Sequence, residues 1–145
     1  MKTPFEHFKS DISVVQIEEN LYEGNVSDMW SIGTTPNGGY TMALAAKAIS
    51  ESLEHKDPLI VTANYLNRVN FGKIDIKVET LPSTRSLSSA RATMIQDNEI
   101  KVIFTATFTD FSKSTGLNKA FKKVPIFEKF EDCHLPSLNY GVMAG

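Results

Sequence analysis

The residues with the clearest chemical potential form a short turn, Asn37-Gly38-Gly39, which directly precedes an apolar, alanine-rich stretch with helical spacing. Asn37 is a good helix N-cap residue, and the first amides of a helix have no partners within it. Such amides carry the positive end of the helix dipole, so they hold anions or polarise a carbonyl oxygen. Glycines let a ligand come close to the backbone. Two interpretations follow: a site for a carbonyl or anion, or a tight turn that serves only helix–sheet packing.

No other residues have the spacing of a metal centre or an activated nucleophile. His7, His55 and His134 lie far apart in the sequence and are predicted to be surface residues. Cys133 is the only cysteine and has no marked basic neighbourhood beyond His134, so a nucleophilic role is not expected. Arg68 suits a structural ion pair as well as a ligand contact. We therefore expect neither a metal nor a cofactor.

The turn must be positioned by the helix that follows it. The spacing i, i+3, i+4, i+7 and i+11 predicts a helix over residues 40–53 with one buried apolar face, formed by Met42, Ala45, Ala46, Ile49 and Leu53. Its many alanines let a sheet approach closely, so the helix is expected to be buried on most of its circumference. Near the N-terminus, Thr3 to Glu6 form a capping box with Pro4 at the first helical position, which predicts a second, short helix.

The remaining pattern is that of strands. Alternating or β-branched runs predict strands at 21–26, 59–69, 74–81, 86–96 and 99–111. The run 59–69 is apolar enough for a largely buried strand, and the last four strands are joined by short turns. A long central helix followed by an antiparallel meander predicts an α+β fold in which a curved sheet wraps around the helix.

Composition limits the class of protein. The chain has 145 residues, of which 41% are hydrophobic and 22% charged, so it is expected to fold as a globular domain. The net charge of -2 gives no reason to expect nucleic acid. No run approaches the ~20 apolar residues of a membrane span, so no membrane contact and a cytoplasmic location are expected. Residues 1–111 form the predicted domain, and 112–145 are predicted to be a linker or tail.

Several motifs together resemble a known family. The series W-x-I-G-x-x-x-N-G-G-Y from Trp30, then Tyr65-Leu66-x-Arg68, Val78-Glu79-x-Leu81 and R-S-L-S-x-A-R from Arg85 is similar to acyl-CoA thioesterase II proteins. The resemblance covers about residues 20–111 and is to the N-terminal one of that family's two hotdog domains. Pro125 and Glu131-Asp132-Cys133 resemble the linker that leads to the second hotdog.

The resemblance implies hydrolysis of acyl-CoA to a fatty acid and CoA without a metal. In two-domain members the groups that orient the attacking water lie mainly in the second hotdog. Single-hotdog relatives carry a carboxylate two helical turns after the glycines, where this chain has Ala46. The glutamine on the last strand of the second hotdog has its nearest counterpart here at Phe108. No catalytic residue can therefore be named, and the chain alone is expected to hydrolyse acyl-CoA poorly.

The resemblance does imply a set of substrate-binding residues: Asn37, Gly38, Gly39, Tyr40, Asn64, Arg85 and Ser86. Amides of the glycine turn would stabilise the oxyanion that forms when water attacks the thioester. Arg85 and Ser86 suit a CoA phosphate or the pantetheine arm, although a solvated strand start explains them about as well. Two roles are possible for the aromatic residues Trp30, Tyr40 and Tyr65: they line an acyl tunnel, or they belong to the core.

Two hypotheses for function remain. The first is an acyl-CoA thioesterase of which this chain is the N-terminal half or a truncated form. The second is a non-catalytic hotdog that binds acyl thioesters or acts as a structural partner. A hydratase or dehydratase would need an Asp and His pair near Gly39, and none is present. The expected ligand is acyl-CoA or a related thioester. The expected partner is a second hotdog or a second copy of the chain, paired along residues 59–68.

Overall fold

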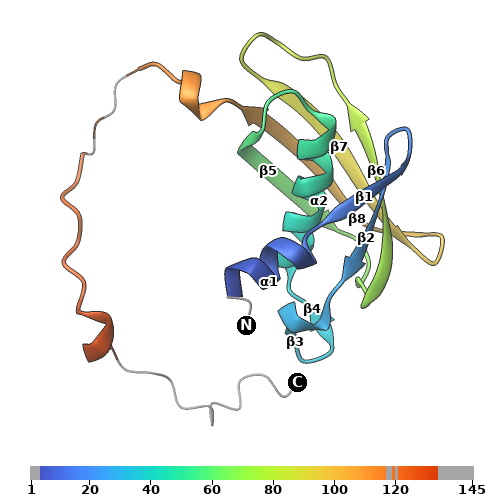
Figure 1. Cartoon of the computed structure of the whole chain (residues 1–145), viewed down its shortest axis with the longest axis horizontal. Helices are drawn as coiled ribbons and strands as arrows, with labels where there is room; N and C mark the ends of the chain where they lie inside the picture. Colours follow the sequence, from blue (N-terminus) through green and yellow to red (C-terminus); the bar gives the residue numbers. More distant parts are fainter. Residues whose placement is uncertain (1–3, 117–118, 120, 134–145) are drawn as a thin grey trace. The chain divides into compact units, whose positions relative to one another are not determined.

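The computed structural model describes residues 4–116, 119 and 121–133. By its contacts the chain divides into two units, Met1–Ser112 and Lys113–Gly145. The first unit contains the long helix and every strand of the described residues, and the second contains the short helix η3 (Phe130–Asp132) (Figure 1). None of the helices described is long and apolar enough to cross a membrane. That residues 112–145 serve as a linker stays a prediction.

One antiparallel sheet of six strands forms the body of the first unit. Its strand order is β1-β2-β6-β7-β8-β5, with bounds β1 (Val14–Glu18), β2 (Leu21–Val26), β5 (Asp57–Tyr65), β6 (Gly72–Thr80), β7 (Ser88–Gln96) and β8 (Glu99–Thr109). Helix α2 (Gly38–Ser52) lies across one face of this sheet (Figure 1). A two-stranded ribbon of β3 (Ser31–Ile32) and β4 (Thr35–Pro36) leads into the helix. The predicted α+β arrangement is confirmed.

The core lies between α2 and the sheet. Alternate residues of β6, β7 and β8 point at the helix and are buried, as the period of two requires. The buried face of α2 consists of Tyr40, Thr41, Leu44, Ala45, Ala48 and Ile49. The predicted face was partly wrong, because Met42 and Ala46 are only partly buried. A helix that is apolar on most of its circumference can turn about its axis without changing its pattern, so the period alone could not fix its orientation.

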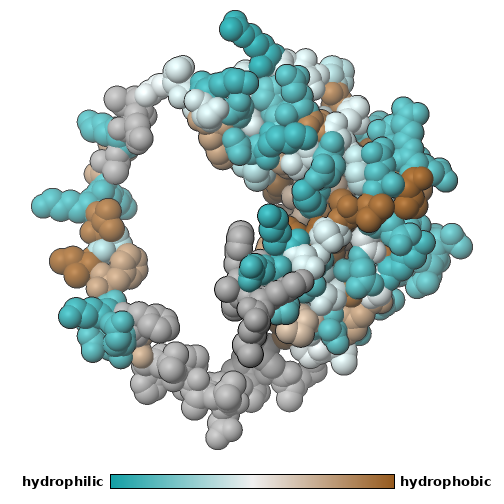
Figure 2. Space-filling view, viewed as in Figure 1, coloured by the Kyte–Doolittle hydropathy of each residue, from teal (hydrophilic) through white to brown (hydrophobic). Residues whose placement is uncertain are grey.

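The position of β5 also differs from the prediction. The meander contains only β6, β7 and β8, and β5 pairs with β8 at the edge of the sheet. Strand β5 is therefore not largely buried: Leu59 and Ile60 are exposed. The opposite edge, β1, was not predicted from the sequence, and its Val15 and Ile17 are exposed as well. Figure 2 shows apolar surface in the region where β1 lies in Figure 1. Both ends of the sheet are thus apolar edge strands.

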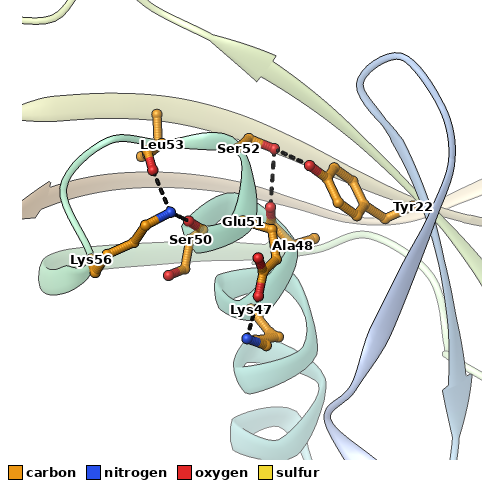
Figure 3. A network of polar contacts seen from close by, with 8 residues as sticks. All are labelled: Tyr22, Lys47, Ala48, Ser50, Glu51, Ser52, Leu53 and Lys56. Atoms are coloured by element: carbon orange, nitrogen blue, oxygen red, sulfur yellow. Dashed lines mark hydrogen bonds and ion pairs between the residues drawn. The ribbon is translucent and has the colours of Figure 1, made fainter.

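Both ends of helix α2 are anchored by polar contacts. At its C-terminal end, shown in Figure 3, the ammonium group of Lys56 donates to the carbonyls of Ser50 and Leu53, both at 2.6 Å. A cation there satisfies carbonyls that have no partner within the helix and complements the helix dipole. The hydroxyls of Ser52 and Tyr22 lie 2.9 Å apart and join the helix to β2.

The predicted N-terminal helix is present as α1 (Pro4–Asp11), with Pro4 at its first position. Thr3, which would complete its capping box, lies outside the described residues. Phe8 and Asp11 of this helix contact residues near the N-terminal end of α2: Phe8 packs against Trp30 and Tyr40, and Asp11 is bonded to both. The start of α2 is therefore enclosed by α1 on one side.

Candidate functional site

The turn before α2 is an N-cap built by Asn37. Its side-chain oxygen accepts hydrogen bonds from the amides of Gly39, at 2.8 Å, and Tyr40, at 3.4 Å. The predicted N-cap is confirmed, and the helix begins at Gly38, two residues earlier than predicted. The cap occupies two of the amides that a ligand could have used. Gly38 is the first helical residue, and within the described part of the chain its amide has no hydrogen-bond acceptor.

Gly38 also has a packing role. A Cβ atom at this position would lie 3.0 Å from the hydroxyl oxygen of Tyr65 and 3.2 Å from Cζ of the same ring. That hydroxyl donates a 2.6 Å bond to the carbonyl of Gly38. At Gly39 an added Cβ would lie 3.1 Å from the Asn37 oxygen, so the second glycine makes room for the cap. The packing interpretation of the glycine turn is therefore confirmed. The turn also leaves one amide without an acceptor among the described residues, and a site for a carbonyl or anion there stays a prediction.

A cavity of about 390 Å³ lies beside this turn, between the start of α2 and the end of β5. We call it the β5-side cavity; it is lined by Thr35, Pro36, Gly38, Thr41, Tyr65, Leu66, Asn67, Arg68 and Val69. The Arg68 guanidinium donates through Nη2 to the carbonyl and hydroxyl of Thr34, at 2.5 and 2.7 Å. Of the two alternatives for Arg68, the ion pair is not found among the described residues. The lining contains neither a carboxylate nor an imidazole.

A second cavity, of about 430 Å³, lies on the other side of the same turn. We call it the aromatic cavity; its lining is Phe8, Met29, Trp30, Ser31, Ile32, Asn37, Gly39 and Tyr40. Phe8 and Trp30 meet edge to face with centroids 5.1 Å apart, and the Trp30 and Tyr40 rings are 6.3 Å apart. Asn37 and Gly39 line this cavity while Gly38 lines the other, so the two cavities flank the first turn of α2.

Tyr40 contributes its ring but not its hydroxyl to the site. The hydroxyl accepts a 2.9 Å bond from the amide of Ser27 and donates to the carbonyl of Asp11 at 2.9 Å, with the Asn25 carbonyl 3.2 Å away. Burial raises the pKa of this hydroxyl; the Asp11 carboxylate adds to the increase, and the bond from Ser27 opposes it. Tyr40 thus ties α2 to β2 and α1 as a neutral side chain.

Three of the seven predicted binding residues lie away from this turn. Asn64 is exposed and lies next to Tyr65 on β5. Because strand side chains alternate and Tyr65 faces α2, Asn64 points to the opposite face of the sheet. Arg85 and Ser86 lie in the loop between β6 and β7, beside the C-terminal end of α2, where Ser88 contacts His55. A helix of this length extends about 22 Å, so the loop and the turn lie near opposite ends of α2, and a role of Arg85 and Ser86 in binding stays a prediction.

The prediction that the histidines lie on the surface is wrong for His55. This side chain is buried, and its Nδ1 lies 2.6 Å from the hydroxyl of Ser88, which is buried too. Ser88 is 33 residues away from His55 in the sequence, so no local pattern could predict that His55 would be buried against it. His7 is exposed, and His134 lies outside the described residues. Across residues 4–116, 119 and 121–133, no group of three or more potential metal ligands comes together.

The two positions expected to lack catalytic groups are core or near-core positions. Phe108 is buried between sheet and helix, and Ala46 is partly buried on α2. The sequence did not decide between an acyl tunnel and the core for Tyr65, and it indicated no role for Thr41. The hydroxyl of Thr41 donates to the Gly38 carbonyl at 2.9 Å. The signal for Tyr65 was available, since it shares a strand face with Val61 and Ala63, which pack against the core.

Comparison with known proteins agrees with this architecture. Residues 26–109 match the family described as acyl-CoA thioesterase N-terminal domain. The thioesterase-like protein TwmA of Talaromyces wortmannii is 26% identical over 133 residues, which are 90% of this chain and 37% of TwmA. A structure from Thermobifida fusca described as a thioesterase II superposes with a TM-score of 0.83 at 19% identity, over 94% of this chain and 50% of that one.

A protein of unknown function with a hotdog fold from Alicyclobacillus acidocaldarius superposes with a TM-score of 0.72 at 23% identity, over 87% of this chain and 47% of that one. These structural matches confirm the hotdog fold. The chain spans about a third to a half of the length of these relatives. Since the family match covers more than half of its residues, the chain belongs to the acyl-CoA thioesterase N-terminal domain family.

Proposed function

We propose that this chain binds an acyl-CoA thioester at the first turn of α2, with the thioester carbonyl accepting a hydrogen bond from the amide of Gly38. The observation that carries the proposal is that Gly38 lines a cavity and that its amide has no acceptor in the described part of the chain. The positive end of the α2 dipole adds to the attraction for a carbonyl oxygen that gains negative charge. The Gly38 carbonyl, which belongs to the next peptide group, accepts bonds from the hydroxyls of Tyr65 and Thr41, and these bonds hold the start of α2 in place.

The chain supplies part of a hydrolytic site in this proposal. An amide at the developing oxyanion is worth about 100-fold or more in rate. Hydrolysis also needs a group that orients or deprotonates water, and the lining of the β5-side cavity offers neither a carboxylate nor an imidazole. We therefore propose that the missing groups come from a second hotdog domain, and that this chain alone binds acyl-CoA with little turnover.

The second hotdog, or a second copy of this chain, is proposed to pair along β5. This strand is an edge of the sheet, and Leu59 and Ile60 leave it with exposed apolar side chains. Unpaired strand edges of this kind invite pairing with another chain. Tyr65 and Leu66, at the end of the same edge, line the β5-side cavity, so a partner on β5 would be next to the proposed thioester position. The cytoplasm remains the proposed location.

Two measurements on the 145-residue chain test the proposal. Calorimetry with acetyl-, hexanoyl-, dodecanoyl- and palmitoyl-CoA is expected to show binding, and a thiol-release assay with the same compounds is expected to show little hydrolysis. Robust turnover that persists through purification would mean that catalytic groups lie within this chain. Absence of binding to every acyl-CoA would refute the proposed site and favour a purely structural role.

A further inference from the structure

We infer that a segment of the second unit, formed by Lys119 and residues 121–127, binds an anionic lipid surface. We call it the basic segment. The inference goes beyond the proposed function and is independent of it, because it uses no residue of the glycine turn or of the two cavities. The sequence-based expectation of no membrane contact rested on the absence of a spanning run, and it does not bear on a segment that lies on a bilayer without crossing it.

The charge of the chain is unevenly distributed. Residues 113–145 contain five of its 15 basic and three of its 17 acidic residues, a formal charge of +2, whereas residues 1–112 contain 10 basic and 14 acidic residues, a charge of -4. Residues 111–127 contain no aspartate or glutamate and four lysines: Lys113, Lys119, Lys122 and Lys123. A basic stretch attached to an otherwise acidic chain is typical of a contact with a membrane or with nucleic acid.

The apolar side chains of the basic segment lie almost fully in solvent. Their exposed fractions are 85% for Phe121, 81% for Val124, 102% for Ile126 and 78% for Phe127. Among the described residues of the first unit, the most exposed large apolar side chain is Met29, at 70%. Exposed apolar side chains that occur together mark a surface for another molecule or for a membrane. The basic segment therefore carries both kinds of group that a bilayer surface attracts.

The combination of groups favours lipid over nucleic acid. Lys119 lies over the ring of Phe121, with its Nζ 5.4 Å from the ring centroid, so charge and apolar surface are adjacent. At a bilayer the ammonium groups meet anionic headgroups while apolar side chains enter the boundary with the acyl chains. Single-stranded nucleic acid would engage the charges and the rings but would leave Val124 and Ile126 in water. The segment also contains no arginine, the residue best suited to bidentate phosphate contacts.

The backbone of the segment is compatible with this contact. Residues 121–127 form neither helix nor strand, so their side chains are not fixed to opposite faces of a regular element. Each lysine near an anionic surface strengthens binding about fivefold. The apolar side chains supply the second signal that stable attachment to a membrane requires. Anionic lipids are concentrated in the cytoplasmic leaflet, which agrees with the proposed location.

Vesicle sedimentation with the 145-residue chain tests the inference. One set of vesicles contains phosphatidylcholine alone, and the other contains equal parts of phosphatidylcholine and phosphatidylserine. We expect binding to the mixed vesicles, about tenfold or more weaker binding to the neutral ones, and a loss of affinity as salt is added.

Two matched pairs of substitutions locate the charge contact. Lys122→Gln with Lys123→Gln should weaken binding to the mixed vesicles about 25-fold. Lys9→Gln with Lys77→Gln removes the same number of charges from exposed side chains of the first unit and should leave the affinity unchanged. The comparison separates the basic segment from the net charge of the chain. Circular dichroism checks that each variant is folded.

A second comparison locates the apolar contact. Phe121→Ser with Phe127→Ser should weaken binding to the mixed vesicles about tenfold or more. This loss should persist at high salt, because it does not depend on charge. Val15→Ser, at a side chain 67% exposed on the edge strand β1, should change nothing.

The outcomes separate this inference from the proposed function. Failure to bind the mixed vesicles, equal binding to both kinds of vesicle, or equal losses in the two lysine pairs would overturn the inference. Binding of a single-stranded oligonucleotide that requires Lys122 and Lys123, without binding to vesicles, would overturn it in favour of nucleic acid. Calorimetry with acyl-CoA, in the absence of vesicles, tests the proposed site separately, so each of these results leaves that site in place.

Discussion

The hydroxyl of Tyr65 donates a 2.6 Å hydrogen bond to the carbonyl of Gly38, and its ring occupies the space that a side chain at Gly38 would need. This contact joins the last residue of β5 to the first residue of α2. It explains why α2 begins with a glycine. It also holds the Gly38 carbonyl in place, next to the Gly38 amide that has no acceptor among the described residues.

Gly38→Ala should destabilise the protein although alanine favours helices. The propensity gain is about 0.5–1 kcal/mol, whereas forcing a methyl group against the Tyr65 ring costs about 1–3 kcal/mol. We expect a net loss of about 1 kcal/mol in the free energy of unfolding, measured by urea denaturation. In a Tyr65→Leu background the same substitution should cost less, because the ring is gone. Equal costs in both backgrounds would show that Tyr65 does not set the need for glycine.

Asn37→Ala should remove the N-cap of α2. Loss of a capping side chain typically costs about 0.5–2 kcal/mol of stability. The matched control is Asn64→Ala, at an exposed asparagine on the outer face of β5, which should stay within about 0.5 kcal/mol of the parent. Thermal unfolding of both variants decides the point. A stable Asn37→Ala protein would mean that the bonds to Gly39 and Tyr40 contribute nothing.

Ser88→Ala should leave the buried nitrogen of His55 without its partner. An unsatisfied buried polar atom costs about 1–3 kcal/mol. Ser89→Ala, one residue further along β7, removes a partly buried hydroxyl whose partner, Thr107, can turn to water, so a smaller loss is expected. Acyl-CoA affinity should be the same in both variants, since this end of α2 is far from Asn37. A loss of affinity confined to Ser88→Ala would place His55 in the binding site.

Tyr40 should make stability fall at alkaline pH. Burial raises its pKa in the folded protein above the ordinary value of 10.0, so the fold favours the protonated hydroxyl. This contribution is complete below the unfolded pKa and is lost as the pH rises through the folded pKa. Tyr40→Phe should be less stable near neutral pH but should lose less stability between about pH 9 and 11.5. Parallel pH profiles for the two proteins would contradict the shift.

The two edges of the sheet should differ in association. Ile60→Lys places a charge on β5, at a side chain 60% exposed, and Val15→Lys does the same on β1, at a side chain 67% exposed. Light scattering at micromolar concentration is expected to give a dimer for the parent and for Val15→Lys, and the 16.1 kDa monomer for Ile60→Lys. A parent that scatters as a clean monomer, or dissociation caused by Val15→Lys, would remove pairing through β5.

Much of the fold follows from local pattern. The 3.6-residue period and the cap at Asn37 predicted α2, and the period of two predicted β2, β6, β7 and β8, because these signals depend on nearest neighbours along the chain. The order of the strands in the sheet was harder to predict than the strands themselves. Pro58 was a local signal for an edge strand or a bulge in residues 57–65, whereas the choice of β8 as the neighbour depends on contacts with residues more than 35 positions away.

The site was predicted in part for the same reason. Asn37, Gly38, Gly39 and Tyr40 are adjacent in sequence, so their proximity was assured, and the structure adds which amide is left free. Asn64 lies one residue before Tyr65, so its side chain is on the opposite face of the sheet, and its role in binding stays a prediction. Phe8 and Arg68 reach the start of α2 from opposite directions, through the packing of α1 and the loop after β5. No periodicity of helices or strands predicts that residues so far apart in the sequence lie near the same turn.

The central claim is that the amide of Gly38 holds a thioester carbonyl. Nitrogen–proton correlation spectra test it most directly with two CoA derivatives that cannot be hydrolysed: a ketone that keeps the carbonyl, and a thioether of the same length that lacks it. We expect the ketone to move the Gly38 amide proton downfield and the thioether to leave it nearly unchanged, with both compounds bound. A Gly38 signal that responds to neither compound, while amides near Arg85 and Ser86 shift, would contradict the claim.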